Sequence, residues 1–295
     1  MPAQLEQDVV TLTLGTSTVH IALKGATVFS YSYDGQERLF TSAKSNVHTS
    51  DPAAVRGGVP VCWPIFGPAP SDSPLFSKLK QHGFARTSVW EYVGAQDEGE
   101  GIKATFKLEP NEQIQALFTL PFVLTYTVHL LPYSLSLSLS VANPSSAIAP
   151  LPFQALLHSY FRLPDSVHPR DVLVTPLENL AFADKAGPKD GLTKEAERRK
   201  VVDVDGPGGE VDRVYFRAPD RLELATGAAG TVRVHKKGLP DVVLWNPGPE
   251  KGAKIGDMED RGWERYVCLE PGLVEPFQFL DPGKSWEGGI EISFA

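Results

Sequence analysis

The sequence predicts an all-β protein, folded as a sandwich or barrel of antiparallel strands. Apolar and polar residues alternate over long stretches, and short segments rich in β-branched and aromatic residues recur at even spacing. The 26 glycines and 25 prolines supply turns between these segments. A chain of 295 residues is long enough to bury a core. Because no linker rich in Pro, Ser and Gly divides it, we expect a single domain over residues 1–295.

The N-terminal third is predicted to form short strands. Val9–Leu14, residues 17–23 and residues 26–33 each combine strand-forming residues with alternation, and single glycines separate them. Residues 41–70 carry few regular signals, so we expect a long ordered loop there.

The clearest strand signal lies in the middle of the chain. Residues 134–141 read SLSLSLSV, which places the leucines and the valine on one face and the serines on the other. Pro144 ends this strand, because proline lacks the N–H that a strand ladder needs. Residues 122–131 (FVLTYTVHLL) are also strand-like, and a Pro-Tyr link joins the two segments, which predicts a hairpin.

The C-terminal third continues this pattern, and helix signals are few. Residues 189–199 contain helix formers without an apolar stripe, so we expect a solvated loop or a short surface helix. Residues 206–209 (GPGG) are expected to form a flexible loop. The strands predicted in this part are Arg221–Ala225, 230–235, 241–245, 264–270 and Ser285–Phe294.

The charge balance narrows the range of partners. With 28 Lys and Arg against 36 Asp and Glu, the formal charge is −8. Nucleic acids and anionic membranes are bound through a positive field, so the composition argues against both. A small anion held by a few local arginines stays compatible with it. The N-terminus has no signal-peptide pattern, and no stretch of about 18 apolar residues occurs, so we expect a cytoplasmic protein.

Cysteine and histidine spacing indicates neither a disulfide framework nor a metal site. The two cysteines, Cys62 and Cys268, belong to no CxxC pattern, and the seven histidines form neither HxH nor HExxH. The chain also lacks a GxSxG elbow and a Walker A loop. Ser159 beside His158 is unconvincing as a nucleophile, because adjacent strand residues face opposite ways.

Three features of the sequence suggest a binding or catalytic role beyond turns and strands. The first is residues 56–67 (RGGVPVCWPIFG). Paired glycines beside Arg56 permit close approach of the backbone to a ligand. The structural alternative is a buried β-arch with Arg56 in an ion pair. Trp63 in this stretch is expected to fill the core.

Residues 81–86 (QHGFAR) are the second stretch, with an amide, an imidazole and a guanidinium group close together. Arginine is the side chain best suited to bidentate binding of phosphate or carboxylate. The structural alternative is a surface loop whose charges face water, with His82 packed against a loop carbonyl.

The third signal is a pair of distant residues, His158 in LLHSYF and Glu270 in VCLEPG. Both lie in apolar local sequence, where an ionisable group is costly unless it is paired. A buried Glu with a raised pKa can serve as a general base, and a His can be the complementary acid. The alternative is that each is a satisfied core residue.

Six motifs in order resemble those of the glucose-6-phosphate 1-epimerases, the hexose-6-phosphate mutarotases of the aldose 1-epimerase superfamily. They are RGGVPVCWPIFG, QHGFAR, LHSYFR, EVDRVYF, VVLWNP and VCLEPG, which span residues 56 to about 272. The family fold is a large antiparallel β-sandwich, the galactose mutarotase-like supersandwich, and the strand pattern agrees with it.

The resemblance implies that this protein interconverts the α and β anomers of hexose 6-phosphates without a cofactor or a metal. It implies that Glu270 is the general base and His158 the general acid of ring opening. It places Arg56, Gln81, Arg86 and Asp212 in the substrate site, with Asp212 accepting hydrogen bonds from sugar hydroxyls and the arginines holding the phosphate. His82 and Trp245 are further candidates for sugar contact, although Trp245 is expected to fill the core.

Other functions stay open at this point. An aldose 1-epimerase acting on unphosphorylated hexoses would share the acid and the base, but a neutral sugar gives no reason to bury two arginines. A non-catalytic sugar-phosphate binder would need neither His158 nor Glu270. A glycoside hydrolase would need two carboxylates across a scissile bond, such as Asp212 and Glu270, yet nothing indicates an oligosaccharide cleft. We expect a monomer whose partner is a small sugar phosphate.

Overall fold

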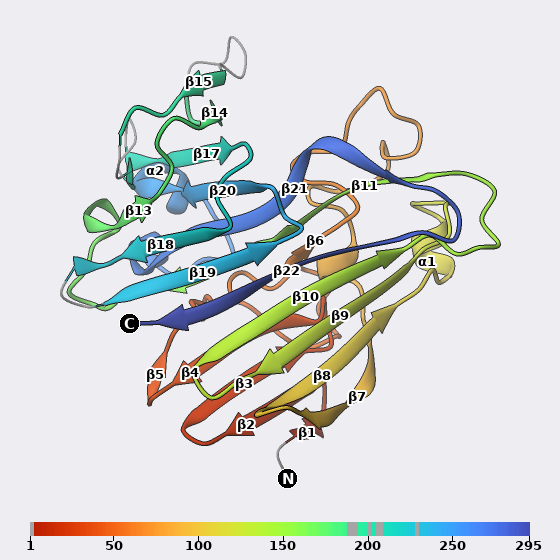
Figure 1. Ribbon diagram of the computed structural model, residues 1–295, viewed down its shortest axis with the longest axis horizontal. Helices are drawn as coiled ribbons and strands as arrows, with labels where there is room; N and C mark the ends of the chain where they lie inside the picture. The colour runs from red at the N-terminus through yellow and green to blue at the C-terminus, as the bar shows by residue number, and fades with distance from the viewer. Residues whose placement is uncertain (1–2, 188–193, 200–201, 205–208, 228–229) are drawn as a thin grey trace.

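Three antiparallel sheets make up the protein in a computed structural model, which describes residues 3–187, 194–199, 202–204, 209–227 and 230–295 (Figure 1). The predicted all-β class is therefore confirmed. Among the described residues, the α-helices are the short α1 (Glu112–Gln115) and α2 (Gly248–Gly252). None of the described helices has the length and apolar character needed to cross a membrane.

The five-stranded N-terminal sheet confirms the first predicted strands. Its strands pair in chain order, as an antiparallel meander along the lower edge of the view in Figure 1. The strands are β1 (Ala3–Glu6), β2 (Val9–Leu14), β3 (Ser17–Ala22), β4 (Thr27–Tyr33) and β5 (Gln36–Glu37).

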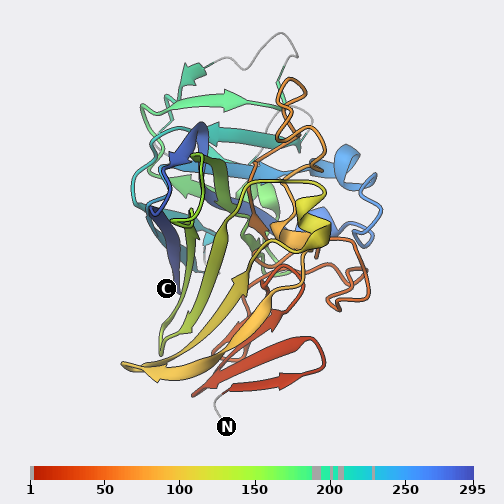
Figure 2. The same cartoon turned by 90° about the vertical axis from the view of Figure 1, so that its right-hand side faces the viewer.

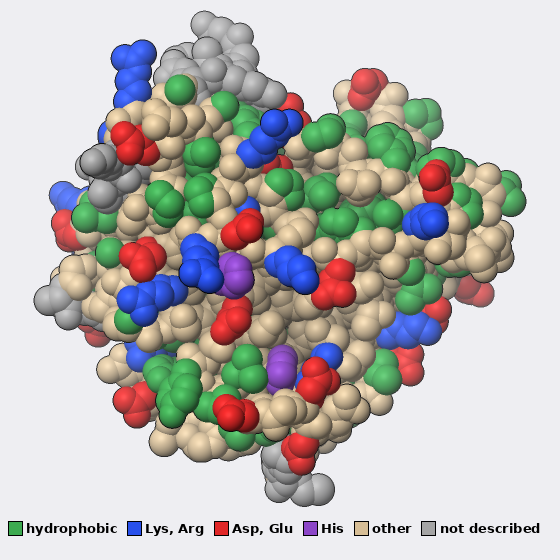
Figure 3. Space-filling model, viewed as in Figure 1, with side chains coloured by type: hydrophobic (Ala, Val, Ile, Leu, Met, Phe, Trp, Pro, Cys, Tyr) green, Lys and Arg blue, Asp and Glu red, His purple; other side chains and the backbone are tan. Residues whose placement is uncertain are grey.

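The nine-stranded sheet contains the predicted central hairpin, in which Leu135 pairs with Leu130 and Val141 with Leu124. Figure 3 views this side of the molecule, where Lys and Arg side chains are interspersed with Asp and Glu, as on a solvated face. In spatial order the strands are β16 (Val202–Asp203), β13 (Leu173–Thr175), β18 (Arg221–Ala225), β19 (Thr231–Lys237), β22 (Ser285–Phe294), β10 (Ser134–Ala142), β9 (Val123–Leu130), β8 (Gly101–Leu108) and β7 (Glu91–Glu98).

The eight-stranded sheet carries the long strand β21 (Tyr266–Leu280) between two partners. In spatial order its strands are β15 (Lys194–Ala196), β14 (Ala181–Asp184), β17 (Val211–Tyr215), β20 (Asp241–Asn246), β21, β11 (Leu151–Leu157) and β6 (Val61–Cys62), and β12 (Tyr160–Arg162) pairs with β21 beside this path. Because β21 is hydrogen-bonded on both sides and buried from Tyr266 to Val274, its side chains in that stretch are held rigidly.

Several sequence predictions need correction. The expected loop or helix at 189–199 is wrong for Lys194–Ala196, which form β15, and residues 189–193 lie outside the described residues. The loop predicted at 206–209 falls on undescribed residues except for Gly209. The strand predicted at 264–270 starts later and runs to Leu280, because a 3-10 turn occupies Gly262–Arg265. The loop over 41–70 is confirmed apart from β6.

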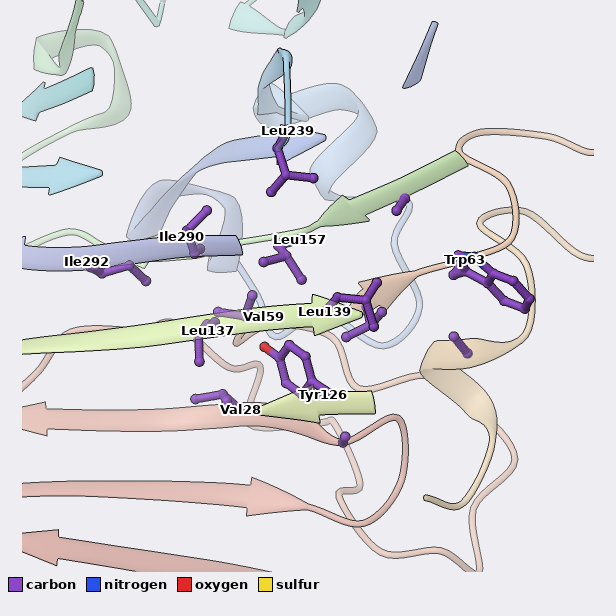
Figure 4. Close-up of a cluster of buried hydrophobic side chains, with 14 of the residues drawn as sticks. Val28, Val59, Trp63, Tyr126, Leu137, Leu139, Leu157, Leu239, Ile290 and Ile292 are labelled. Carbon is purple, nitrogen blue, oxygen red and sulfur yellow. The ribbon is translucent and has the colours of Figure 1, made fainter. Parts of the chain in front are cut away.

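The main hydrophobic core contains residues from all three sheets. Leu137 and Leu139 are 0% and 1% exposed, whereas Ser138 between them is half-buried, so the alternation in β10 fixes which face is inside. Each fully buried leucine contributes roughly 1.5–3 kcal/mol. Figure 4 shows these leucines with buried residues from all three sheets or their loops, including Val28, Val59, Tyr126, Leu157 and Ile290.

Candidate active site

A cavity of about 480 Å3 opens between β17, β20, β21, α2 and the loop that precedes β7. In Figure 2 the orange loop between β6 and β7 and the blue helix α2 both lie on the right-hand side of the view. The nine-stranded sheet lies mainly on the other side. All eight residues singled out in the sequence line this cavity, namely Arg56, Gln81, His82, Arg86, His158, Asp212, Trp245 and Glu270. A larger hollow of about 760 Å3, next to the end of β22, contains none of them.

Glu270 and His158 come from adjacent parts of the eight-stranded sheet. Glu270 lies on β21 opposite Val243 of β20, and is 1% exposed. His158 directly follows β11, where its N–H donates to the carbonyl of Pro60, and is 7% exposed. Nδ1 of His158 lies 3.4 Å from Oε1 of Glu270. The expectation that both residues are buried is confirmed.

Part of the hydrogen-bonding capacity of this pair is unused within the described residues. Nδ1 of His158 and Oε2 of Glu270 are buried atoms with no hydrogen-bond partner there. The imidazole is held by rings instead: it stacks on Tyr160 at 4.7 Å and meets the edge of Trp245 at 5.8 Å. A buried polar group normally has a partner, so unpartnered groups that line a cavity indicate a place where a ligand supplies it.

Burial is the main cause of the pKa shifts of both Glu270 and His158. It raises the pKa of Glu270 well above the usual value, and the nearby Asp212 carboxylate raises it further. Burial lowers the pKa of His158 well below 6.5, and the positive charges of Arg86 and Arg56 act in the same direction. Both effects favour the uncharged pair, in which Glu270 carries the proton and His158 is neutral.

His82 lies edge-on to His158, with ring centroids 5.7 Å apart. Its Nδ1 accepts a hydrogen bond from the backbone N–H of Gly67 at 3.1 Å, so the neutral ring carries its proton on Nε2. The side-chain amide of Gln81 lies 3.2 Å from that Nε2, and because this nitrogen carries the proton, the amide has to turn its oxygen toward it to accept the hydrogen bond. Burial and the charge of Arg86 keep the pKa of His82 well below its usual value, which fixes this neutral form.

The two arginines are held by contacts with the cavity wall, and Arg56 contacts both Asp257 and Tyr160. Nε of Arg56 lies 3.0 Å from Oδ1 of Asp257, so the ion pair considered for it exists at the cavity wall. Nη2 of Arg86 donates to the carbonyl of Gln81 at 2.9 Å, while its buried Nε has no partner in the described structure. A guanidinium group offers five N–H donors, so both can still bind an anion.

The paired glycines after Arg56 have a different role from the one expected. A Cβ on Gly57 would lie 2.3 Å from the carbonyl oxygen of Phe40, and one on Gly58 would lie 2.2 Å from that of Val28. Both residues have positive φ. They therefore let the backbone pack against its own neighbours rather than against a ligand.

The cavity also contains cations that the sequence did not reveal. Nζ of Lys185 lies 4.2 Å above the ring of Phe66, and Lys251 and Lys254 of the α2 region line the same cavity. Five Lys and Arg residues thus face Asp212 and Glu270 in a protein of net charge −8. No periodic pattern surrounds these lysines, so only the topology brings them to the site.

Trp63 and Trp245 separate into different environments. Trp63 is fully buried against Phe84, Phe118 and Phe122, which confirms the core prediction. Trp245 is half-buried and lines the cavity, so the expectation that it only fills the core is wrong.

Comparisons with known proteins are consistent across sequence and structure. The family model described as aldose 1-epimerase matches residues 8–293. A protein of Cenchrus ciliaris named "Putative glucose-6-phosphate 1-epimerase" is 32% identical over 281 residues, covering 92% of this chain and 80% of that protein. One of Escherichia coli K12 with the same name is 29% identical over 260 residues, covering 87% and 80%.

Solved structures share the fold. The crystal structure of a protein from Salmonella typhimurium, titled "a putative mutarotase", superposes with a TM-score of 0.85 at 26% identity, covering 99% of this chain and 92% of that one. The galactose 1-epimerase of Lactobacillus acidophilus superposes with a TM-score of 0.71 at 14% identity, covering 99% and 97%, and shows the fold alone.

Proposed function

The chain belongs to the aldose 1-epimerase family, and from this premise we propose that it interconverts the α and β anomers of hexose 6-phosphates, with glucose 6-phosphate as the main substrate. The observation that carries the proposal is the buried pair of His158 and Glu270, each with an atom that lacks a hydrogen-bond partner in the described structure, at a cavity lined by five Lys and Arg side chains. The pair suits proton transfer, and the cations suit a phosphate.

Ring opening requires one proton to leave O1 of the sugar and one to reach O5. Glu270 as the carboxylate takes the proton from the O1 hydroxyl, and His158 as the imidazolium gives its proton to O5 while the C1–O5 bond breaks. Both oxygens are bonded to C1, so the base and the acid must lie close together. The 3.4 Å between Nδ1 of His158 and Oε1 of Glu270 fits that need.

The pair carries one proton throughout the cycle. After ring opening Glu270 is protonated and His158 is neutral, which is the form that burial favours. Desolvation therefore stabilises the enzyme form that accompanies the open-chain aldehyde. Rotation about C1–C2 then presents the other face of the aldehyde, and the two residues return their protons in the reverse direction to close the other anomer.

The remaining residues bind and orient the sugar phosphate. We assign the phosphate to Arg56 and Arg86, because charge-assisted hydrogen bonds from guanidinium groups hold dianions strongly. Gln81 donates beside them, and Lys185 adds positive charge. Asp212 accepts hydrogen bonds from sugar hydroxyls.

The aromatic and imidazole groups of the wall complete the assignment. Trp245 offers an apolar face to the sugar ring, and His82, whose Nε2–H is directed at Gln81, orients that amide beside the substrate. An excess of cations in an acidic protein also attracts an anionic substrate to this one opening.

Anomer exchange measured by NMR tests the substrate class. Saturation transfer between the anomeric protons is recorded for glucose 6-phosphate and for free glucose with the same enzyme stock. We expect strong acceleration for the phosphate and little for the free sugar. Equal acceleration of both would make the protein an epimerase of unphosphorylated hexoses, the alternative that the shared acid–base pair allows.

Arg86→Ala tests the phosphate contact directly. We expect KM for glucose 6-phosphate to rise about 10–100-fold, because a hydrogen bond to a charged group contributes about 1.5–3 kcal/mol. The effect on free glucose should stay within about 3-fold. Arg233→Ala, at a surface ion pair with Glu223 outside the cavity, is the matched control and should change neither value. An equal loss for both sugars would mean that Arg86 only supports the fold.

A further inference from the structure

Three possible metal ligands from two separate parts of the chain converge at the proposed acid–base pair. A nitrogen of His158, the sulfur of Cys268 and a carboxylate oxygen of Glu270 all lie within 4.8 Å of one another. Cys268 and Glu270 are two residues apart on β21, so their side chains emerge on the same face of the strand. No spacing in the sequence shows this group, because His158 is more than a hundred residues away.

The group has open coordination capacity as well as proximity. Nδ1 of His158 and Oε2 of Glu270 are buried and have no hydrogen-bond partner within the described part of the chain. Both residues line the cavity, which gives an ion a path from solvent, and Cys268 is fully buried beside them. Imidazole, thiolate and carboxylate together are a donor set that binds Zn2+.

The distance between the nitrogen and oxygen ligands matches a tetrahedral ion. Zn–N and Zn–O bonds of about 2.0–2.2 Å at a tetrahedral angle place the two ligand atoms about 3.3–3.5 Å apart. The separation between Nδ1 of His158 and Oε1 of Glu270 is 3.4 Å. The sulfur has to close at most about 1.3 Å to complete a third bond, which rotation of a cysteine side chain can supply.

We propose that His158, Cys268 and Glu270 form an inhibitory Zn2+ site within the catalytic cavity. The ion takes the lone pairs that proton transfer needs, so it blocks the enzyme instead of assisting it. Binding releases the thiol proton of Cys268 and the carboxyl proton of Glu270 to solvent. Mg2+ prefers oxygen ligands in octahedral geometry, so it is expected not to bind here. The inhibition rests on the proposed function, whereas the binding site does not.

Calorimetric titration with Zn2+ alone, without sugar, tests the site whether or not hexose 6-phosphates are the substrate. We expect one Zn2+ per chain in the wild type. Cys268→Ala should weaken the affinity by at least about 100-fold, since even outer-shell partners of a metal contribute 10–100-fold. Cys62→Ala is the matched control, because Cys62 is equally buried and clusters with residues of the cavity wall but lies outside the group, so its loss should leave the affinity unchanged.

Two further measurements separate a ligand from a structural residue. Co2+ alone should give a thiolate charge-transfer band in the wild type and in Cys62→Ala, and no such band in Cys268→Ser. The serine variant replaces Cys268→Ala in both measurements if the alanine variant does not fold. Zn2+ should inhibit anomer exchange competitively with glucose 6-phosphate, and a chelator should restore it. Absence of Zn2+ binding, or equal affinity in wild type and the Cys268 variants, would overturn the proposal.

Discussion

Asp241 and Glu270 are both carboxylates with 1% exposure, on the paired strands β20 and β21, yet their surroundings are opposite. Oδ1 of Asp241 accepts from the N–H of Arg217, and Oδ2 accepts from those of Val274 and Glu275, at 3.1–3.3 Å. Oε2 of Glu270 accepts nothing from the described residues. One sheet therefore holds a carboxylate with backbone hydrogen bonds on both oxygens and another with one oxygen that has no partner in the described structure.

The difference separates a structural charge from a functional one. Asp241 ties the chain at Arg217 to β21, so its bonds stabilise the fold. Glu270 is buried without such compensation, and that costs stability. A buried carboxylate oxygen without a partner can accept a hydrogen bond or a proton from a ligand. Catalytic sites commonly lower stability in favour of activity in this way. Buried ionisable residues can thus be sorted by how many of their hydrogen bonds the protein itself completes.

Glu270→Gln should give the largest effect. The amide cannot take a proton from O1, so we expect kcat to fall about 10³–10⁴-fold, at the upper end of what one general base contributes. KM should stay within a few-fold, because the binding groups are untouched. Anomer exchange at saturating glucose 6-phosphate measures the first value, and calorimetric binding of the sugar checks the second. Activity near that of the wild type would mean that Glu270 is not the general base, and that it does not differ in function from Asp241.

Asp241→Asn should affect stability instead of chemistry. An amide in place of the carboxylate turns an NH2 group toward backbone N–H donors and leaves at least one of them unpaired. We expect a loss of about 2–4 kcal/mol in the free energy of unfolding, measured by denaturant titration. The kcat of the folded fraction should remain within a few-fold. A variant as stable as the wild type would show that the three N–H bonds contribute little.

Lys236→Met extends the same test to a cation. Lys236 is 1% exposed, and its Nζ donates to the carbonyls of Ala218 and Pro240 at 2.7 and 3.2 Å. Methionine fills much of the volume but leaves both carbonyls unpaired, so we expect a loss of about 1–3 kcal/mol. Lys254→Met, on an exposed residue at the cavity, is the control for the hydrophobic substitution and should leave stability unchanged. Equal effects of the two changes would argue against a structural role for Lys236.

The sequence predicts the periodic parts of this fold and the parts of the site that lie in motifs. The segment SLSLSLSV alone specifies the buried face of β10, because successive side chains of a strand point to opposite faces and only the apolar set can face the core. β7 is missed because it is a sheet edge with a bulge at Tyr92 and Gly94, where exposure removes the hydrophobic signal. Lys185 is missed because it follows the short β14, and nothing local relates it to Glu270.

The sequence also does not show that Oε2 of Glu270 lacks a hydrogen-bond partner among the described residues. Apolar neighbours predict burial for Glu270 as they do for Asp241, and both are buried. Whether backbone N–H groups reach a carboxylate depends on the register between β20 and β21 and on the turn at Arg217. Those are long-range features, so the distinction between structural and catalytic carboxylates appears only in three dimensions.

The smallest predicted effect is a gain in stability from Glu270→Gln that depends on pH. Burial raises the pKa of Glu270 above its unfolded value of about 4.5, so the folded protein keeps a proton that the unfolded chain loses. The stability associated with this group is fully present below the unfolded pKa and is lost as pH rises through the folded pKa. Glutamine does not titrate and should escape that loss.

The variant should therefore unfold at nearly the same temperature as the wild type at pH 4.5, and be more stable by about 0.5–2 kcal/mol at pH 7–8. Thermal unfolding of both proteins across this range measures the difference. Asp241→Asn is the contrast, because there the amide also loses hydrogen bonds and the variant should be the less stable protein at neutral pH. A Glu270→Gln variant that is less stable than the wild type at pH 7 would mean that the carboxylate is satisfied in solution, and would place Glu270 with Asp241 among the structural residues.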